Sequence, residues 1–288
     1  IAVCAYIGLI VWFLFGVDGF MVGTQCAARW LKNAWTPETD YEHGWMVPCI
    51  ALYLLKHGCR GAKGLVAGPT LKGLWLVALG ALLCVFSIRT QQGRIAIGAI
   101  PFLLTGMVWC YWGGAVARKC AFPFFFLWLC IPLPGFQQAT VGLQLMATDL
   151  AHWGAGLFGV QTIVDGTNIA SATGNWDAYS IAGGCSGIRS LMALLMFSVA
   201  WAYLAEGLSL WKRCVLALSA IPLSILANAF RVTSIFVCAE YINSAFAGKT
   251  WHDWSGMLFF FPASLLGLML LHSLLAGEVL FFKKRRTV

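Results

Sequence analysis

The sequence predicts an all-α polytopic membrane protein with about eight transmembrane helices, an interfacial helix on the outer side and a small β-hairpin cap. Three observations support this fold class. Hydrophobic residues make up 60% of the 288-residue chain and charged residues only 10%, which is far from the composition of a soluble domain. The apolar residues gather in runs close to membrane-spanning length. The basic residues favour alternate loops between these runs.

Eight apolar runs are candidate transmembrane helices. The second run is short and needs flanking residues to cross the bilayer. The runs cover residues 1–23, 44–55, 73–88, 95–113, 120–135, 186–206, 213–241 and 253–277. Because the loops between them leave no room for a large soluble domain, we predict one transmembrane domain over residues 1–288.

The lysines and arginines predict the orientation. If both termini are cytoplasmic, 12 of the 19 basic residues lie on the inner side, as the positive-inside rule requires. These are Lys56, Arg60, Lys63, Lys72, Arg118, Lys119, Lys212, Arg213, Lys283, Lys284, Arg285 and Arg286. This asymmetry explains most of the net charge of +8 without a nucleic-acid partner. We therefore expect a multi-pass protein of the inner (cytoplasmic) membrane. Its basic C-terminal run is most simply a cytoplasmic stop signal, and acidic membrane lipids are a secondary partner of this run.

Residues 136–185 form the predicted extracytoplasmic insertion. The stretch 136–160 is long enough to cross the membrane, but polar residues are scattered through it, a pattern typical of a helix lying in the interface. These are Gln137, Gln138, Gln144, Thr148, Asp149 and His152. Asp165-Gly166 and Thr173-Gly174-Asn175 are turn signals between short β-prone pieces, so we expect a hairpin cap over the outer mouth.

Cys185 is the strongest candidate for chemistry. It lies in the small-residue turn Gly183-Gly184-Cys185-Ser186-Gly187, where the polar loop meets the sixth apolar run. A helix N-terminus favours a thiolate, and Arg189 follows one turn later. The alternative interpretation is a buried packing residue, as expected for most of the 11 cysteines. None of them forms Cys-x-x-Cys or another metal-ligand spacing, so we expect no metal.

Arg231 and His252 join Cys185 on the outer side in this topology. Arg231 would stabilise a thiolate or oxyanion, and His252 would transfer protons. The alternatives are that Arg231 reaches the interface or pairs with Glu240, and that His252 is an interfacial anchor. Further candidates for supporting or substrate-binding roles are Ser186, Arg189, Asn228, Asp253 and His43. Asn228 precedes Arg231 by one turn and can share its cavity.

Several segments resemble the signature blocks of the exosortase/archaeosortase family. They are Cys185-Ser186-Gly187-Ile188-Arg189-Ser190, Asn228-Ala229-Phe230-Arg231, His252 followed by Gly256, Tyr41-Glu42-His43-Gly44, and Ile131-Pro132-Leu133-Pro134. The resemblance covers residues 41 to 265. It implies a membrane cysteine transpeptidase with a triad of Cys185, Arg231 and His252. Such enzymes act on exported proteins that carry a C-terminal sorting signal, made of a short motif, a hydrophobic helix and a basic tail.

One departure from the family pattern leaves the subfamily and the sorting motif open. Members often carry an acidic residue shortly before the cysteine, where this chain has Gly183 and Gly184. Two other function classes also stay open. Arg231, Arg189 and Glu240 could line the pathway of a transporter or flippase, and the thiol could serve a lipid acyltransferase. Rossmann and P-loop glycine patterns are absent, so we expect no cofactor.

Overall fold

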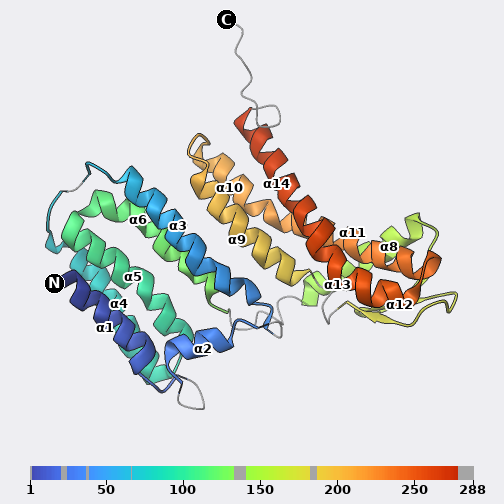
Figure 1. Ribbon diagram of the computed structural model, residues 1–288, viewed down its shortest axis with the longest axis horizontal. Helices are drawn as coiled ribbons and strands as arrows, with labels where there is room; N and C mark the ends of the chain where they lie inside the picture. Colours follow the sequence, from blue (N-terminus) through green and yellow to red (C-terminus); the bar gives the residue numbers. More distant parts are fainter. Residues whose placement is uncertain are drawn as a thin grey trace, which may run out of the picture. The chain divides into compact units, whose positions relative to one another are not determined.

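The computed structural model describes residues 2–20, 25–36, 39–65, 67–132, 141–181 and 187–277. These residues are mostly helical, with one small three-stranded sheet, which confirms the predicted helical class and the presence of a β element. The chain divides into two compact units, residues 1–134 and 135–288, and each is described by itself (Figure 1). A single functional domain over residues 1–288 stays a prediction.

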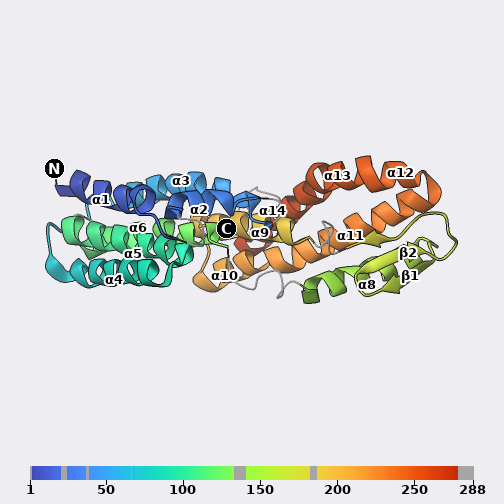
Figure 2. The same cartoon turned by 90° about the horizontal axis from the view of Figure 1, so that it is seen from below.

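The first unit is a helical bundle built around α5. Figures 1 and 2 both show α5 between α4 and α6. Half of its length is buried, including Ala96, Ala99 and Leu103, because neighbouring helices cover it on several sides. The elements are α1 (Ala2–Gly16), α2 (Ala27–Asn33), η2 (Glu42–Trp45), α3 (Met46–Gly61), η3 (Leu71–Gly73), α4 (Leu74–Thr90), α5 (Gly93–Trp112), α6 (Gly114–Phe126) and η4 (Leu127–Cys130).

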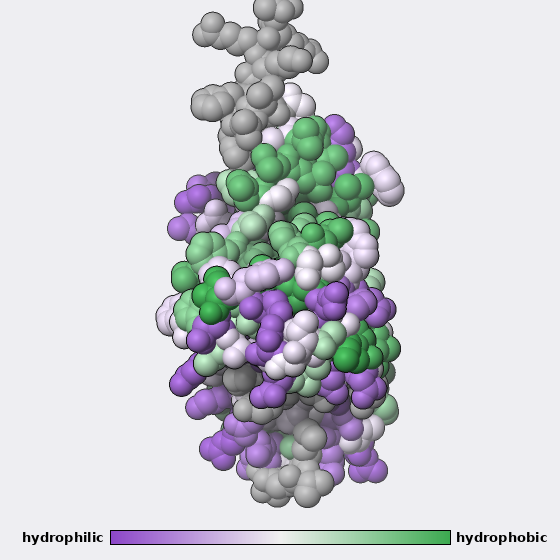
Figure 3. Space-filling view, turned by 90° about the vertical axis from the view of Figure 1, so that its right-hand side faces the viewer, coloured by the Kyte–Doolittle hydropathy of each residue, from purple (hydrophilic) through white to green (hydrophobic). Residues whose placement is uncertain are grey.

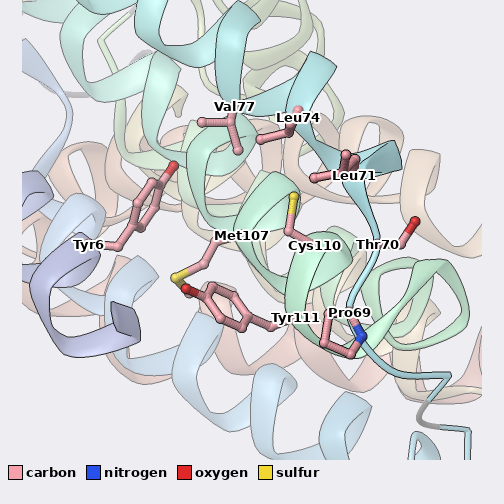
Figure 4. Close-up of a pocket in the computed structure, with 9 residues that line it drawn as sticks. All are labelled: Tyr6, Pro69, Thr70, Leu71, Leu74, Val77, Met107, Cys110 and Tyr111. Atoms are coloured by element: carbon pink, nitrogen blue, oxygen red, sulfur yellow. The ribbon is translucent and has the colours of Figure 1, made fainter. Parts of the chain in front are cut away.

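Small residues allow α4 and α5 to approach closely. A Cβ atom added to Gly106 would lie 2.8 Å from Val77, and one added to Gly80 would lie 2.7 Å from Leu103. Close approach through glycines is typical of helix pairs within membranes. At one end of this pair, α1, the start of α4 and α5 enclose a groove of about 490 Å³ (Figure 4).

The second unit is arranged around α11. This helix packs against α8, α9 and α14, and its interior face includes Val232, Ile235 and Phe236. The elements are α8 (Val141–Leu157), β1 (Thr162–Asp165), β2 (Asn168–Ser171), β3 (Tyr179–Ser180), α9 (Ile188–Leu204), α10 (Leu210–Leu218), α11 (Ala220–Tyr241), α12 (Ser244–Phe246), η5 (Ala247–Trp251), α13 (His252–Ser255), η6 (Gly256–Phe260) and α14 (Phe261–Ala276). Figure 3 looks onto the side of this unit that carries α12, where both hydrophobic and hydrophilic residues reach the surface.

The predicted cap is present as an antiparallel sheet beside α8 (Figure 2). Strands β1 and β2 form a hairpin in which Asp165 pairs with Asn168. Gly166 in this turn has φ +59° and Gly174 has φ +77°, conformations that glycine adopts easily. Both turn signals are therefore confirmed, and β3 adds a third strand that the sequence did not predict.

Four helical stretches are long and apolar enough to cross a membrane among the described residues, and α1 and α9 are shorter apolar helices. The four are Leu71–Thr90, Gly93–Trp112, Leu210–Tyr241 and Ser244–Ala276. The expected count of about eight is not confirmed. Some of the predicted runs form helices that are too short to cross the bilayer. Helix α6, at the fifth run, has 13 residues and is roughly 20 Å long, less than the bilayer core of about 30 Å. Helix α3 carries Lys56, His57 and Arg60 in its second half.

Candidate active site

The start of α9 is fixed against Asn228 of α11. Gly187 precedes α9 with φ +73°, and a Cβ atom there would lie only 2.6 Å from the Cγ atom of Asn228. Its carbonyl oxygen accepts a hydrogen bond of 2.8 Å from the amide of Leu191. Cys185 and Ser186 lie just before this contact, outside the described residues. Gly187 therefore connects the cysteine-bearing segment to the helix that carries Asn228 and Arg231.

Replacing Gly187 by alanine is expected to lower the free energy of unfolding by about 2–5 kcal/mol. The left-handed backbone costs roughly 1–2 kcal/mol for a residue with a Cβ atom, and overpacking against Asn228 adds about 1–3 kcal/mol. Thermal unfolding of the purified protein measures the loss. The control is Gly174→Ala, since Gly174 has φ +77° but nothing within 4 Å of an added Cβ atom. Equal losses in the two variants would show that the Asn228 contact is not tight.

Arg231 and His252 are joined by a direct hydrogen bond. The Arg231 Nη2 atom donates to the backbone carbonyl oxygen of His252 over 3.0 Å. Gly256 permits this approach, because a Cβ atom there would lie 3.1 Å from Nε of Arg231. That Nε atom is buried without a hydrogen-bond partner among the described residues. The guanidinium group therefore lies between α11 and the turn that carries His252.

A second contact fixes the same turn to α11. The indole nitrogen of Trp251 donates to the Ser234 hydroxyl over 2.9 Å, and that hydroxyl donates to the carbonyl oxygen of Arg231 over 2.6 Å. His252 starts the single α-helical turn α13, which lies between the π-helical segments η5 and η6. Interruptions of this kind are frequent at functional sites. The sequence did not identify Ser234 and Trp251 as functional residues. The only signal for them was their position in the chain, Ser234 three residues after Arg231 and Trp251 directly before His252.

Asp253 lies next to the imidazole of His252. The Nδ1 atom of His252 is 3.0 Å from Oδ1 of Asp253, with 27% of the His252 side chain and 65% of the Asp253 side chain exposed. An ionised carboxylate only accepts hydrogen bonds, so this contact favours a proton on Nδ1 and leaves Nε2 as the basic nitrogen. Arg189 lies in the first turn of α9 and is exposed.

Glu240 holds the sheet cap on the end of α11. Its carboxylate accepts hydrogen bonds from Nδ2 of Asn175 at 2.6 Å and Nε1 of Trp176 at 2.8 Å. The hydroxyls of Thr173 and Ser171 add donors at 3.2 Å and 3.4 Å. Glu240 is nine residues beyond Arg231, roughly 14 Å along the helix. The alternative prediction of an Arg231–Glu240 pair is therefore wrong. The Glu240 carboxylate binds residues of the cap, whereas Arg231 binds the backbone of the turn that carries His252.

Exchanging Glu240 for glutamine is expected to loosen the cap. Asn175 and Trp176 donate to different carboxylate oxygens, and in glutamine one of these becomes an NH2 group, which donates but does not accept. We expect amide hydrogen exchange over residues 171–176 to accelerate on the order of tenfold. The amides of Thr173 and Asn175 donate to the Ser171 hydroxyl and report on the change directly. Asp177→Asn, an exposed carboxylate of the same loop, is the control. Unchanged exchange in the Glu240 variant would contradict the anchoring role.

His43 belongs to the first unit, whereas Arg231 and His252 belong to the second. It is 5% exposed in η2, and its ring lies 5.2 Å from that of Tyr41. Burial lowers the pKa of His43 below its ordinary value, so the ring is neutral. Hydrogen bonding to the backbone of Leu129 and Asp40 opposes this shift but is the smaller effect. Its supporting role stays a prediction.

The sequence profile of the transmembrane exosortase family matches residues 35–270. The chain belongs to the transmembrane exosortase family. This match spans most of the chain and both units, and it confirms the family suggested by the sequence motifs. No curated protein and no solved structure matches the chain.

This exosortase is accordingly a membrane protein, in keeping with its apolar helices. The matched region contains the segments that carry Asn228, Arg231 and His252; the first two lie on α11, and the structure joins Arg231 to His252. No group of three or more potential metal ligands occurs among the residues that the structure describes.

Proposed function

We propose that this exosortase is a cysteine transpeptidase in which Cys185, Arg231 and His252 form the catalytic triad. The observation that carries the proposal is the Arg231–His252 hydrogen bond at 3.0 Å beside the anchored start of α9. Gly187 contacts Asn228, which lies one turn from Arg231 on α11. Cys185 is two residues before Gly187 in the sequence, a separation of at most about 7 Å along the chain.

The first half of the proposed reaction forms a thioester. His252 takes the thiol proton of Cys185, and the thiolate attacks the carbonyl carbon of the scissile peptide bond, forming a C–S bond. Negative charge develops on the carbonyl oxygen. Arg231 has five N–H donors, of which one is used by the His252 carbonyl, so others are available to stabilise this oxyanion. The C–N bond then breaks, and His252 returns the proton to the departing amine.

The second half resolves the thioester. An acceptor nucleophile loses its proton to His252 and attacks the thioester carbonyl, so that the C–S bond breaks and the Cys185 thiolate is released. An amine on a lipid or glycan gives transfer, and water gives hydrolysis. Asp253 supports both halves by keeping the proton on Nδ1, so that Nε2 is the nitrogen that accepts and returns protons.

The proposed substrates are exported proteins with a C-terminal sorting signal. The hydrophobic helix of the signal would approach through the bilayer, and its motif would reach the outer mouth of the enzyme. This arrangement places the active site on the extracytoplasmic face of the inner membrane, as the distribution of basic residues also predicts.

Co-expression with exported reporters tests this function. Each reporter carries a C-terminal signal from an exported protein of the same source organism, and its mass is measured with and without the enzyme. We expect loss of the reporter's C-terminal tail, with added mass on the new C-terminus if transfer occurs. Intact reporters with every native signal would contradict the proposal and favour a transporter or a lipid acyltransferase.

A further inference from the structure

The first unit contains a second, larger groove of about 840 Å³, within the size range of ligand pockets. Its walls come from α1, α2, α3, α5 and η4, all in one compact unit. Most of the lining is apolar, including Phe15, Trp45, Ile97, Ile100 and Leu127. Phe15 and Trp45 are 65% and 53% exposed, so large hydrophobic surfaces are open to a ligand. The apolar side chains of this lining can bind a hydrocarbon chain.

This apolar lining also contains two positively charged side chains. Arg29 and Lys32 both line the groove and both are exposed. Their spacing of three residues places them on the same face of α2. Neither side chain forms a hydrogen bond or ion pair with the described residues, and no acidic residue is part of the described lining. Among the described residues, the groove therefore presents positive charge beside an apolar surface, with no acidic side chain in its lining.

The opposite face of α2 is fixed, so the two cations have a defined position. Ala27 and Trp30 are buried and do not line the groove. A Cβ atom on Gly93 would lie 2.7 Å from the Trp30 ring, and the Arg94 guanidinium lies 5.8 Å from the centre of that ring. Arg94 also donates to the carbonyl oxygen of Pro132 over 2.8 Å. A helix anchored in this way presents Arg29 and Lys32 to a ligand without reordering of its backbone.

We propose that this groove binds a bilayer phospholipid with an anionic head group. The phosphate would contact Arg29 and Lys32, while an acyl chain would lie along the apolar wall. Arginine and lysine are the side chains that usually recognise lipid phosphates next to a membrane. The smaller groove beside Tyr6 and Tyr111 provides a contrast, because its described lining includes no charged residue that could bind a head group (Figure 4).

Competition between lipids on the purified full-length protein tests the proposal without reference to peptidase activity. The protein is placed in bilayer discs of phosphatidylcholine with a minor fraction of phosphatidylglycerol, and the lipids retained after transfer to detergent are measured by native mass spectrometry. We expect preferential retention of phosphatidylglycerol. In Arg29→Gln/Lys32→Gln, the preference is expected to fall roughly 30-fold, the effect of removing two basic residues at a membrane surface.

Two further variants separate head-group binding from general charge and from folding. Lys63→Gln/Arg89→Gln removes the same charge from exposed residues outside the groove and should retain the preference. Ala28→Phe keeps all charges but fills the groove, and should lower the retention of bound lipid. Melting temperatures confirm that each variant is folded. Equal retention of both lipids by the wild type would overturn the proposal, as would an equal loss in the Lys63/Arg89 control.

Discussion

Cys185→Ala is expected to abolish processing of a sorting-signal reporter, with a loss on the order of 10⁴-fold or more in kcat/KM. The loss is this large because no other group in the proposed site can form the thioester, so the reaction loses its intermediate and not only a stabilising contact. The measurement is the rate of tail removal from the reporter in membranes that contain equal amounts of each enzyme variant.

The matched control for this prediction is Cys214→Ala. Cys214 is an exposed thiol of the second unit, and it lies in α10, away from the start of α9. We expect normal processing from this variant. If Cys185→Ala kept its activity while remaining inserted and folded, the nucleophile would have to be another residue, and the family-based assignment of Cys185 would be wrong.

Arg231→Lys is expected to lower kcat about 10²–10³-fold with little change in KM, the effect of losing one oxyanion donor. Lysine keeps the positive charge but lacks the planar fork that can hold the His252 carbonyl and the oxyanion together. Measuring kcat and KM separately matters for this assignment. An arginine that only supported the fold would lower the activity together with the protein yield. Reporter kinetics over a range of substrate levels measure the two constants.

Arg213→Lys is the control for the arginine variant. Arg213 lies in the same unit, and its Nε atom donates to the backbone carbonyl oxygen of Leu208 over 3.0 Å, much as Arg231 donates to His252. Both substitutions remove a similar hydrogen bond, so any common loss of stability appears in both. An equal fall in activity would assign Arg231 a structural role instead of a catalytic one.

Local sequence patterns predicted much of the second unit. The interfacial helix and the hairpin followed from turn residues and polar spacing, and α8 and β1 to β2 occupy those positions. These features are local, because Gly166 and Gly174 favour turns whatever surrounds them. The location of α8 in the membrane interface stays a prediction, since its exposed Trp153 and Leu157 suit an apolar or interfacial environment equally.

The number of membrane spans was less predictable, for a physical reason. A hydropathy run marks apolar residues but not where a helix ends. Gly113, with φ +88°, separates α5 from α6, and Arg118 and Lys119 then fall within α6 instead of a loop. The fifth expected run thus begins inside a short helix that already carries two charges.

The contacts at the candidate site depended on tertiary structure. Glu240 meets its four partners 64 to 69 residues away in the chain, so no local pattern could assign them. The Arg231–His252 bond uses a backbone carbonyl oxygen, a group that every residue carries and that a sequence motif does not distinguish. The sequence motifs did identify both residues, but through their side-chain chemistry and family resemblance.

Trapping the thioester tests the central claim most directly. The purified enzyme is mixed with a reporter that it processes, and hydroxylamine is added as a small nucleophile. We expect the reporter to acquire a C-terminal hydroxamate in wild type and not in Cys185→Ala, and rapid acid quenching should yield a hydroxylamine-sensitive acyl adduct on the Cys185 peptide. Processing without any hydroxamate, or an adduct on a different cysteine, would contradict the mechanism.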